Sequence, residues 1–356
     1  MSHEGAIQVT DSGDAGAPPE EAGSASFSAA LARAAGGRPA AAALRFKTRG
    51  RWQTWSWRGL DREVSRIAAG LADAGFAEGD RLLLLGHPSP RQLVLLIAAA
   101  RAGGAALPVD DAVTGADLDR LLQVEQPRFA FAHGQEGIDL LLCHGATGTV
   151  DVLIYDDARG MRGYGDPRLR SYGALRGSAA PRPLGGSDRL AKIALEGSTG
   201  TLRASDETFL ALEWHPEVLR WLGAWLEVGF VLVLPERLGD WATDRSESAP
   251  TVLFARAGLL NDLVSEALRR LPRPGSWRRQ LVERALDAVR HPSWVRRSLA
   301  LRLIIRPLRR ALGLSRTRSV LVTDDALAAH AHIFIRGLGI DVPGVRHLST
   351  AARGAP

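Results

Sequence analysis

Apolar residues follow two alternating periods along the chain. Short, mostly apolar runs fit buried strands, whereas residues 58–74 repeat apolar positions every third or fourth residue and predict a helix with one buried face. Strands are expected at 81–85, 105–108, 128–132, 150–154, 190–195, 208–212, 230–234, 251–254, 319–322 and 340–342. Further helices are expected at 27–35, 91–102, 117–124, 135–142, 217–227, 257–270 and 325–336. This alternation predicts an α/β protein with parallel, doubly wound sheets that carry helices on both faces.

Residues 44–57 depart from this rhythm. Residues 44–47 and 51–57 are aromatic and alternating, and Thr48-Arg49-Gly50 separates them. Two alternating runs joined by a short turn that contains glycine predict a β-hairpin.

Composition divides the chain into four parts. Residues 1–25 are Gly, Ala, Ser, Pro and acids without periodicity and are expected to form a disordered tail. A first α/β subdomain is expected over 26–160, followed by a connector at 161–187 that is rich in Gly, Pro, Arg and Ser. A second α/β subdomain spans 188–356 and carries a basic helical insert at 277–318.

The charge, the cysteine content and the absence of long apolar runs indicate the cellular compartment of the protein. The 356 residues carry a net charge of +6, and Lys47 and Lys192 are the only lysines. The single cysteine, Cys143, excludes an internal disulfide and fits a reducing compartment. The N-terminus lacks the features of a secretory signal, and no apolar run approaches the roughly 20 residues that span a bilayer. We therefore expect a cytoplasmic protein.

A loop rich in Gly, Ser and Thr follows the strand expected at 190–195. Backbone N–H groups and hydroxyls in such a loop can surround a phosphate. The alternative is a plain turn, because small polar residues also favour turns.

The order of several segments resembles a known family. The runs RWQTWSW, GLADAGFAEGDRLLLL, AAARAGGAALPVD and QPRFAFA resemble the N-terminal half of the AMP-forming adenylate ligases, a superfamily that includes the acyl-CoA synthetases. The later runs ETFLALEWHPEVLRWLGAWLEVGFVLVL and APTVLFARAGLLNDL continue the match. The insert and the run SVLVTDDALAAHAHIFIRGLGIDV most resemble the long-chain fatty acyl-CoA synthetase branch. The resemblance covers residues 26–350 and implies two doubly wound αβα subdomains and a ligase that uses ATP and magnesium.

The resemblance also shows where this chain departs from the family's phosphate-binding loop. Four loop residues match it, namely Gly197, Ser198, Thr199 and Gly200. Arg203 stands at the position of the family's lysine, Leu202 replaces a proline and Ala204 replaces a glycine. Glu196 stands where a serine is usual, and two unit charges about 4 Å apart repel by about 4 kcal/mol at an effective dielectric constant near 20.

Two further departures concern the end of the chain. Val345 stands where the family has the tyrosine that stacks on adenine, and Ser349 stands where it has the glutamate that holds magnesium. A neutral serine supplies no charged oxygen ligand for that ion. The sequence ends at Pro356, before the family's ribose-binding aspartate and its C-terminal lid domain with the catalytic lysine, so we expect the lid to be absent and assign no catalytic residue.

These departures predict a catalytically degenerate homologue of the long-chain fatty acid–CoA ligases that binds an acyl chain, a membrane or a partner protein and needs no cofactor. One alternative is an active ATP- and magnesium-dependent ligase, completed in trans by a separate C-terminal domain. Another is an interaction scaffold without catalysis.

The histidines and the single cysteine are candidates for an acyl pocket or a metal site. The resemblance implies that His215 lines the acyl pocket, and the alternative is a histidine that merely starts a helix. His133, Cys143 and His144 lack a further ligand at metal-binding spacing, and no metal site is expected. His330 and His332 point to different faces of a helix, so they are not expected to act together.

The basic insert allows two interpretations. Arginines interleave with apolar residues and Trp277 over 277–318, a pattern typical of peripheral attachment to the inner face of a membrane. The alternative is a solvated helical face over a core. We expect no nucleic-acid partner, because no nucleic-acid motif is present and lysine is nearly absent.

Overall fold

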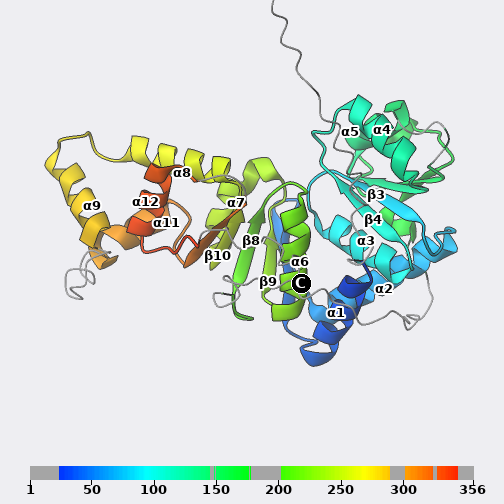
Figure 1. Ribbon diagram of the computed structural model, residues 1–356, viewed down its shortest axis with the longest axis horizontal. Coiled ribbons are helices and arrows are strands. Elements are labelled where there is room, and N and C mark those ends of the chain that lie inside the picture. The colour runs from blue at the N-terminus through cyan, green and yellow to red at the C-terminus, as the bar shows by residue number, and fades with distance from the viewer. Residues whose placement is uncertain are drawn as a thin grey trace, which may run out of the picture.

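The computed structural model describes residues 24–144, 148, 150–175, 177, 202–288, 301–323 and 327–343. Figure 1 shows two sheets with helices around them, and a group of helices that projects beyond the second sheet. We call the six-stranded sheet, which holds the two N-terminal strands, sheet A and the five-stranded sheet sheet B.

Sheet B is parallel throughout. Its order is β4 (Ala105–Val109), β3 (Arg81–Leu85), β5 (Phe129–Ala132), β6 (Val152–Tyr155) and β7 (Leu169–Ser171). Successive side chains of a strand point to opposite faces. Leu82 and Leu84 therefore face α2 (Trp57–Asp73) and α3 (Pro90–Arg101), and Leu83 and Leu85 face α4 (Gly115–Glu125) and α5 (Gln135–His144).

Sheet A combines distant parts of the chain. Its order is β11 (Ser319–Val322), β10 (Val252–Ala255), β8 (Glu207–Ala211), β9 (Val231–Leu234), β1 (Ala42–Thr48) and β2 (Arg51–Ser56). Only the β1–β2 hairpin is antiparallel, and β1 pairs in parallel with β9. The face that carries Leu210, Leu232 and Phe254 packs in the central core with α6 (Pro216–Val228).

The opposite face of sheet A supports the projecting helices. Phe209, Val233 and Leu253 share a second core with α7 (Trp241–Ser248), α8 (Ala257–Arg270) and α12 (Ala329–Gly337). The central core joins both sheets through α1 (Ser24–Gly37), α2, α3 and α6. The layers therefore run helices, sheet B, helices, sheet A, helices (Figure 1).

Helix starts follow the local sequence. The Ser56 side chain accepts a hydrogen bond from the Gly59 N–H at the start of α2, and Ser89 does the same for Gln92 at the start of α3. Serine in this position satisfies an N–H group that has no partner within the helix.

The α/β class with parallel sheets and the doubly wound layering are confirmed. Three details differ from expectation. The hairpin, expected within the first subdomain, lies in sheet A with strands from beyond residue 206. It does so because β1 pairs in parallel with β9. Residues 169–171, expected in a connector, form the edge strand β7, and α7 was not foreseen. The subdomain boundaries themselves stay a prediction.

Some expected elements change or fall outside the described residues. The strand at 340–342 is reduced to one isolated bridge between Ser319 and Asp341. The tail before residue 24, the strand at 190–195 and the Gly/Ser/Thr loop lie outside the described residues. In the insert, the described parts are α9 (Trp277–Ala288), a π-helix (Leu301–Ile305) and α11 (Arg306–Ala311). Within the described ranges, no helix is long and apolar enough to cross a membrane.

Candidate functional site

The candidate site is the edge where strands of both sheets end. His87 and Asp110 follow β3 and β4 of sheet B, whereas Trp214, Glu236 and Arg256 follow β8, β9 and β10 of sheet A. A hydrogen bond between the His87 imidazole and the Glu236 backbone, together with the charge of Arg256 acting on Asp110, places these two sets together. Ligands of open α/β sheets bind at the carboxyl ends of the strands.

One side-chain amide joins the two sheets at this edge. The Trp214 Nε1–H donates to Gln92 Oε1 over 2.7 Å, and Gln92 Nε2–H donates to the Leu85 carbonyl over 2.8 Å. Gln92 is only 1% exposed. Because both ends of the amide are engaged, its orientation is fixed and the end of β8 is tied to the end of β3.

Two titratable groups here have shifted pKa values. Burial lowers the pKa of His87, which therefore favours the neutral imidazole. Burial also raises the pKa of Asp110, against the lowering effect of the Ala112 N–H that donates to it, and the neighbouring Asp111 raises it further. Asp110 Oδ2 is buried and has no hydrogen-bond partner in the part of the chain that the structure describes. The edge thus holds an imidazole with a lowered pKa near a carboxyl group with a raised pKa.

Other charges at this edge support the structure. The Glu236 carboxylate accepts the Arg49 N–H over 2.6 Å and the Gly50 N–H over 2.9 Å. Both of these turn residues have positive φ angles, 50° and 73°, as a tight hairpin turn requires. Arg256 pairs with Glu213. Glu236 therefore fixes the hairpin tip to the end of β9.

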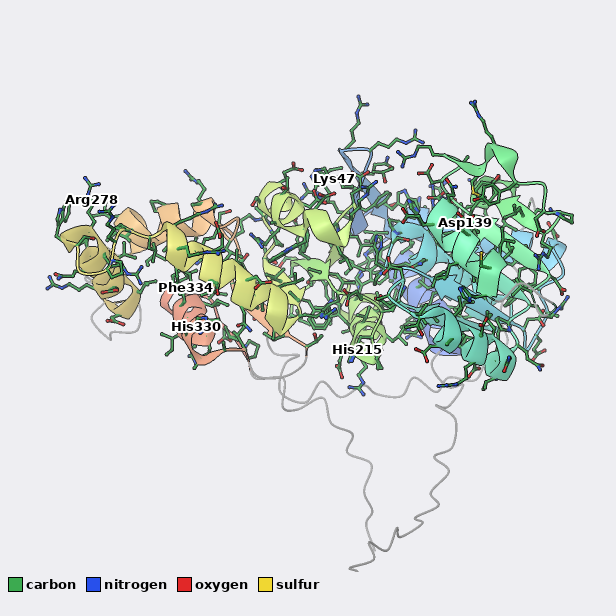
Figure 2. All side chains as sticks on the ribbon, turned by 90° about the horizontal axis from the view of Figure 1, so that it is seen from above. Lys47, Asp139, His215, Arg278, His330 and Phe334 are labelled. Carbon is green, nitrogen blue, oxygen red and sulfur yellow. The ribbon has the colours of Figure 1, made fainter. Side chains whose placement is uncertain are left out.

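His215 lies at the carboxyl end of β8, next to Trp214. It is exposed, and its Nδ1 accepts the Glu217 N–H over 3.3 Å at the start of α6 (Figure 2). This contact matches the helix-start alternative. A role in an acyl pocket stays a prediction.

Arg203 lies at the opposite edge of sheet A. Its N–H donates to Asp206 Oδ2 over 2.7 Å, and Asp206 also accepts from Thr251 Oγ1 and Arg318 Nε at 2.9 and 3.0 Å. These residues precede β8, β10 and β11, so they mark the amino ends of the strands. At about 3.3 Å per residue, the five residues of β8 separate this edge from His215 by about 16 Å. The structure does not bring Arg203 and His215 together.

The remaining predicted site residues lie outside the described residues: Gly197, Ser198, Thr199, Gly200, Val345 and Ser349. The sequence analysis missed Gln92, Asp110 and Asp206. Their position at strand or helix ends was the available signal, since polar residues there face an edge of the sheet rather than its core.

No metal centre is found in the described part of the chain, where no three His, Cys, Asp or Glu side chains gather closely enough to hold an ion. His133 Nδ1 lies 3.9 Å from Asp156 Oδ2, and His144 Nδ1 lies 3.6 Å from Asp119 Oδ2. Cys143 is an exposed free thiol.

Comparison with known proteins gives the family context. Residues 31–167 match the family model described as AMP-binding enzyme. Fatty acid–[acyl-carrier-protein] ligase ScoC of Streptomyces coeruleorubidus is 33% identical over 85 residues, which cover 24% of this chain and 16% of that protein. The aligned segment is therefore a small part of the curated relative.

Solved structures extend the likeness to most of the chain. A putative long-chain-fatty-acid CoA ligase from Rhodopseudomonas palustris has a TM-score of 0.61 at 16% identity, covering 89% of this chain and 74% of its own. The A domain of carboxylic acid reductase from Segniliparus rugosus, in complex with AMP and a co-purified carboxylic acid, has a TM-score of 0.66 at 16% identity, covering 91% and 60%. The chain thus spans less than two thirds of the second of these proteins. The resemblance to the AMP-forming ligase superfamily is confirmed, and the fold is that of the N-terminal domain of adenylate-forming enzymes.

Proposed function

We propose that this chain is a catalytically degenerate relative of the AMP-forming fatty acid ligases, which keeps their fold and does not adenylate an acid by itself. The observation that carries the proposal is the position of Arg203. Adenylation needs positive charge placed against the phosphates at the reacting centre. The Arg203 backbone is held by Asp206 at the amino edge of sheet A, away from the edge where the two sheets meet.

The residues around Arg203 support the same proposal. Leu202 is 7% exposed and belongs to the central hydrophobic core, so it serves packing at the position where the family has a loop proline. Asp206 is 3% exposed and pairs with Arg318. Shifting the Arg203 backbone toward the other edge of sheet A would require this buried carboxylate to lose its hydrogen bond from the Arg203 N–H, which is costly in a low-dielectric site.

Binding of a fatty acid is the retained activity that we propose. ScoC is named as a fatty acid ligase, and the R. palustris protein as a long-chain-fatty-acid CoA ligase. In this proposal the carboxyl edge around Gln92 and Trp214 receives the acid, and no cofactor is used. ATP and magnesium would be needed only if the chain were an active ligase.

Calorimetry with ATP and magnesium, together with pyrophosphate release in the presence of palmitate, tests the proposal. We expect neither ATP binding nor pyrophosphate, while palmitate displaces a fluorescent fatty acid from the protein. The matched variant L202P/R203K/A204G restores three of the family's loop residues, and we expect it to remain inactive because Glu196 stays in the loop and Ser349 still lacks a charge for magnesium. An active fatty acid ligase serves as the positive control.

The other possible results of these assays distinguish between the alternative functions. Micromolar ATP binding by the natural chain would overturn the degenerate interpretation. Pyrophosphate release that begins only when a separately expressed C-terminal ligase domain is added would favour completion in trans. Binding of neither ATP nor fatty acid would favour an interaction scaffold.

A further inference from the structure

Helix α9 carries an exposed stripe of apolar and basic residues. Trp277, Leu281 and Arg284 are spaced at i, i+4 and i+7, so they lie on one side of the helix. Trp277 is 70% exposed and Leu281 is 49% exposed. The helix packs on its neighbours through other residues, because Ala285 is buried and Leu286 packs beside Gly337 of α12.

A second exposed stripe lies on the adjoining helical segment. Leu303 in the π-helix is 66% exposed, and Arg306 and Arg310 follow it three and seven residues later, both exposed. The π-helix continues directly into α11 and contacts α9. We call the six residues of the two stripes the tip surface: Trp277, Leu281, Arg284, Leu303, Arg306 and Arg310.

The arginines of the tip surface have no ion-pair partner within the described part of the chain. Arg284, Arg306 and Arg310 form no ion pair with any residue that the structure describes, whereas Arg279, on another side of α9, pairs with Glu283 over 2.7 Å. The acidic residues of α9 are Glu283, which is thus engaged, and Asp287. The tip surface therefore has an excess of positive charge beside exposed apolar side chains.

The position of the tip surface suits a broad, flat partner. Figure 1 shows α9 at the end of the molecule farthest from sheet B, and Figure 2 shows Arg278 at the same extremity. The Arg278 guanidinium lies 5.4 Å from the centre of the Trp277 ring. A tryptophan flanked by arginines on a projecting element matches the boundary between lipid headgroups and acyl chains.

We propose that the tip surface docks this protein on anionic lipid membranes. The arginines contact lipid phosphates, and Trp277, Leu281 and Leu303 enter the headgroup boundary. An acidic protein is the competing occupant. The lipid surface is favoured because the exposed Trp277, Leu281 and Leu303 lie beside exposed arginines, a combination that suits the headgroup boundary. The proposal goes beyond the proposed function and does not depend on whether the chain binds ATP or fatty acid.

Co-sedimentation with vesicles of phosphatidylcholine alone, or with about one third phosphatidylglycerol, tests the docking. We expect binding to the anionic vesicles that weakens as sodium chloride is raised, and little binding to the neutral ones. Each arginine near an anionic surface contributes about fivefold to partitioning, so R284Q/R306Q/R310Q should bind about a hundredfold more weakly. W277S/L281S should weaken binding without changing the charge.

The matched control is R58Q/R62Q/R162Q, which removes three exposed arginines far from the tip surface. It makes the same change in net charge and should bind within a few-fold of the natural chain. Circular dichroism confirms that each variant is folded. The proposal fails if the natural chain ignores anionic vesicles or if the control triple loses as much binding as the tip triple. It also fails if only an acidic polypeptide, such as polyglutamate, is bound through these arginines.

Discussion

Two tryptophans of α6 allow the value of one buried hydrogen bond to be measured. Trp225 is fully buried, and its Nε1–H donates to the Ala43 carbonyl over 3.0 Å. Ala43 lies at the register shift between β1 and β2, where the strand ladder is interrupted. Trp221, one turn earlier on the same helix, is 4% exposed, and its Nε1 has no hydrogen-bond partner among the residues that the structure describes. The pair therefore differs chiefly in this hydrogen bond.

Replacing each tryptophan with phenylalanine separates the two contributions. Both variants lose a similar volume of indole ring and similar aromatic contacts, with Trp57 at 5.2 Å from Trp225 and Phe254 at 4.7 Å from Trp221. W225F additionally leaves a buried carbonyl without its donor, which costs about 1–3 kcal/mol. W221F removes an N–H group that was already unpaired. We expect W225F to lower the free energy of unfolding by about 1–3 kcal/mol more than W221F.

Urea denaturation followed by far-UV circular dichroism measures both free energies. The comparison is valid if the two variants keep the same dependence on urea, because a changed slope signals a changed unfolded or native state. Equal losses for W225F and W221F, or a larger loss for W221F, would refute the assignment of a stabilising role to the bond between Trp225 and Ala43.

Three further predictions test local features. S56A removes the N-terminal cap of α2 and should cost about 1 kcal/mol in urea denaturation. G70A should lower the melting temperature, because its Cβ would overlap the backbone of a packed segment, whereas G258A, with open space around it, should change stability by less than about 1 kcal/mol. Hydrogen bonds from Lys47 to Asp244 and Glu247 raise the pKa of Lys47. K47M should therefore be less stable than the natural chain below pH 10.5, and this difference in stability should shrink as the pH rises further.

Local patterns predicted helices well. Helix α8 begins and ends at the expected residues 257 and 270, because Leu260, Val264 and Ala267 repeat at helical spacing and all three are buried. Ser56, two residues before the helix expected at 58–74, caps α2, and its hydroxyl accepts the Gly59 N–H. Signals of this kind depend on residues within a few positions of one another, and distant packing does not alter them.

Strand partners could not be predicted in the same way. The alternation in β1 buries Leu44 and Phe46, which identifies its inner face but not its neighbour. The partner, β9, lies nearly two hundred residues later. Strand β7 gave no signal at all, because Leu169–Ser171 is three residues long and contains one apolar side chain. Such a short segment forms a strand only because the rest of the sheet leaves an edge strand free to pair with it.

Strand direction adds spatial information to the motif matches at the candidate site. The resemblance assigned Arg203 to the phosphate-binding loop and His215 to the acyl pocket. Arg203 precedes a parallel strand and His215 follows it, so strand direction places them at opposite edges of sheet A. The same reasoning brings His87, Asp110 and Glu236 together, since each follows a strand and the carboxyl edges of the two sheets face one another.

The Gln92–Trp214 link explains why these edges stay together. Its members are 122 residues apart, and each joins a different sheet, so no local pattern predicts the contact. A buried amide with both ends engaged costs little when its partners are in place and 1–3 kcal/mol when one is missing. This asymmetry favours one relative position of the two sheets over others with similar apolar packing. The edge that would receive a ligand is therefore shaped before any ligand arrives, whether or not the chain can still adenylate it.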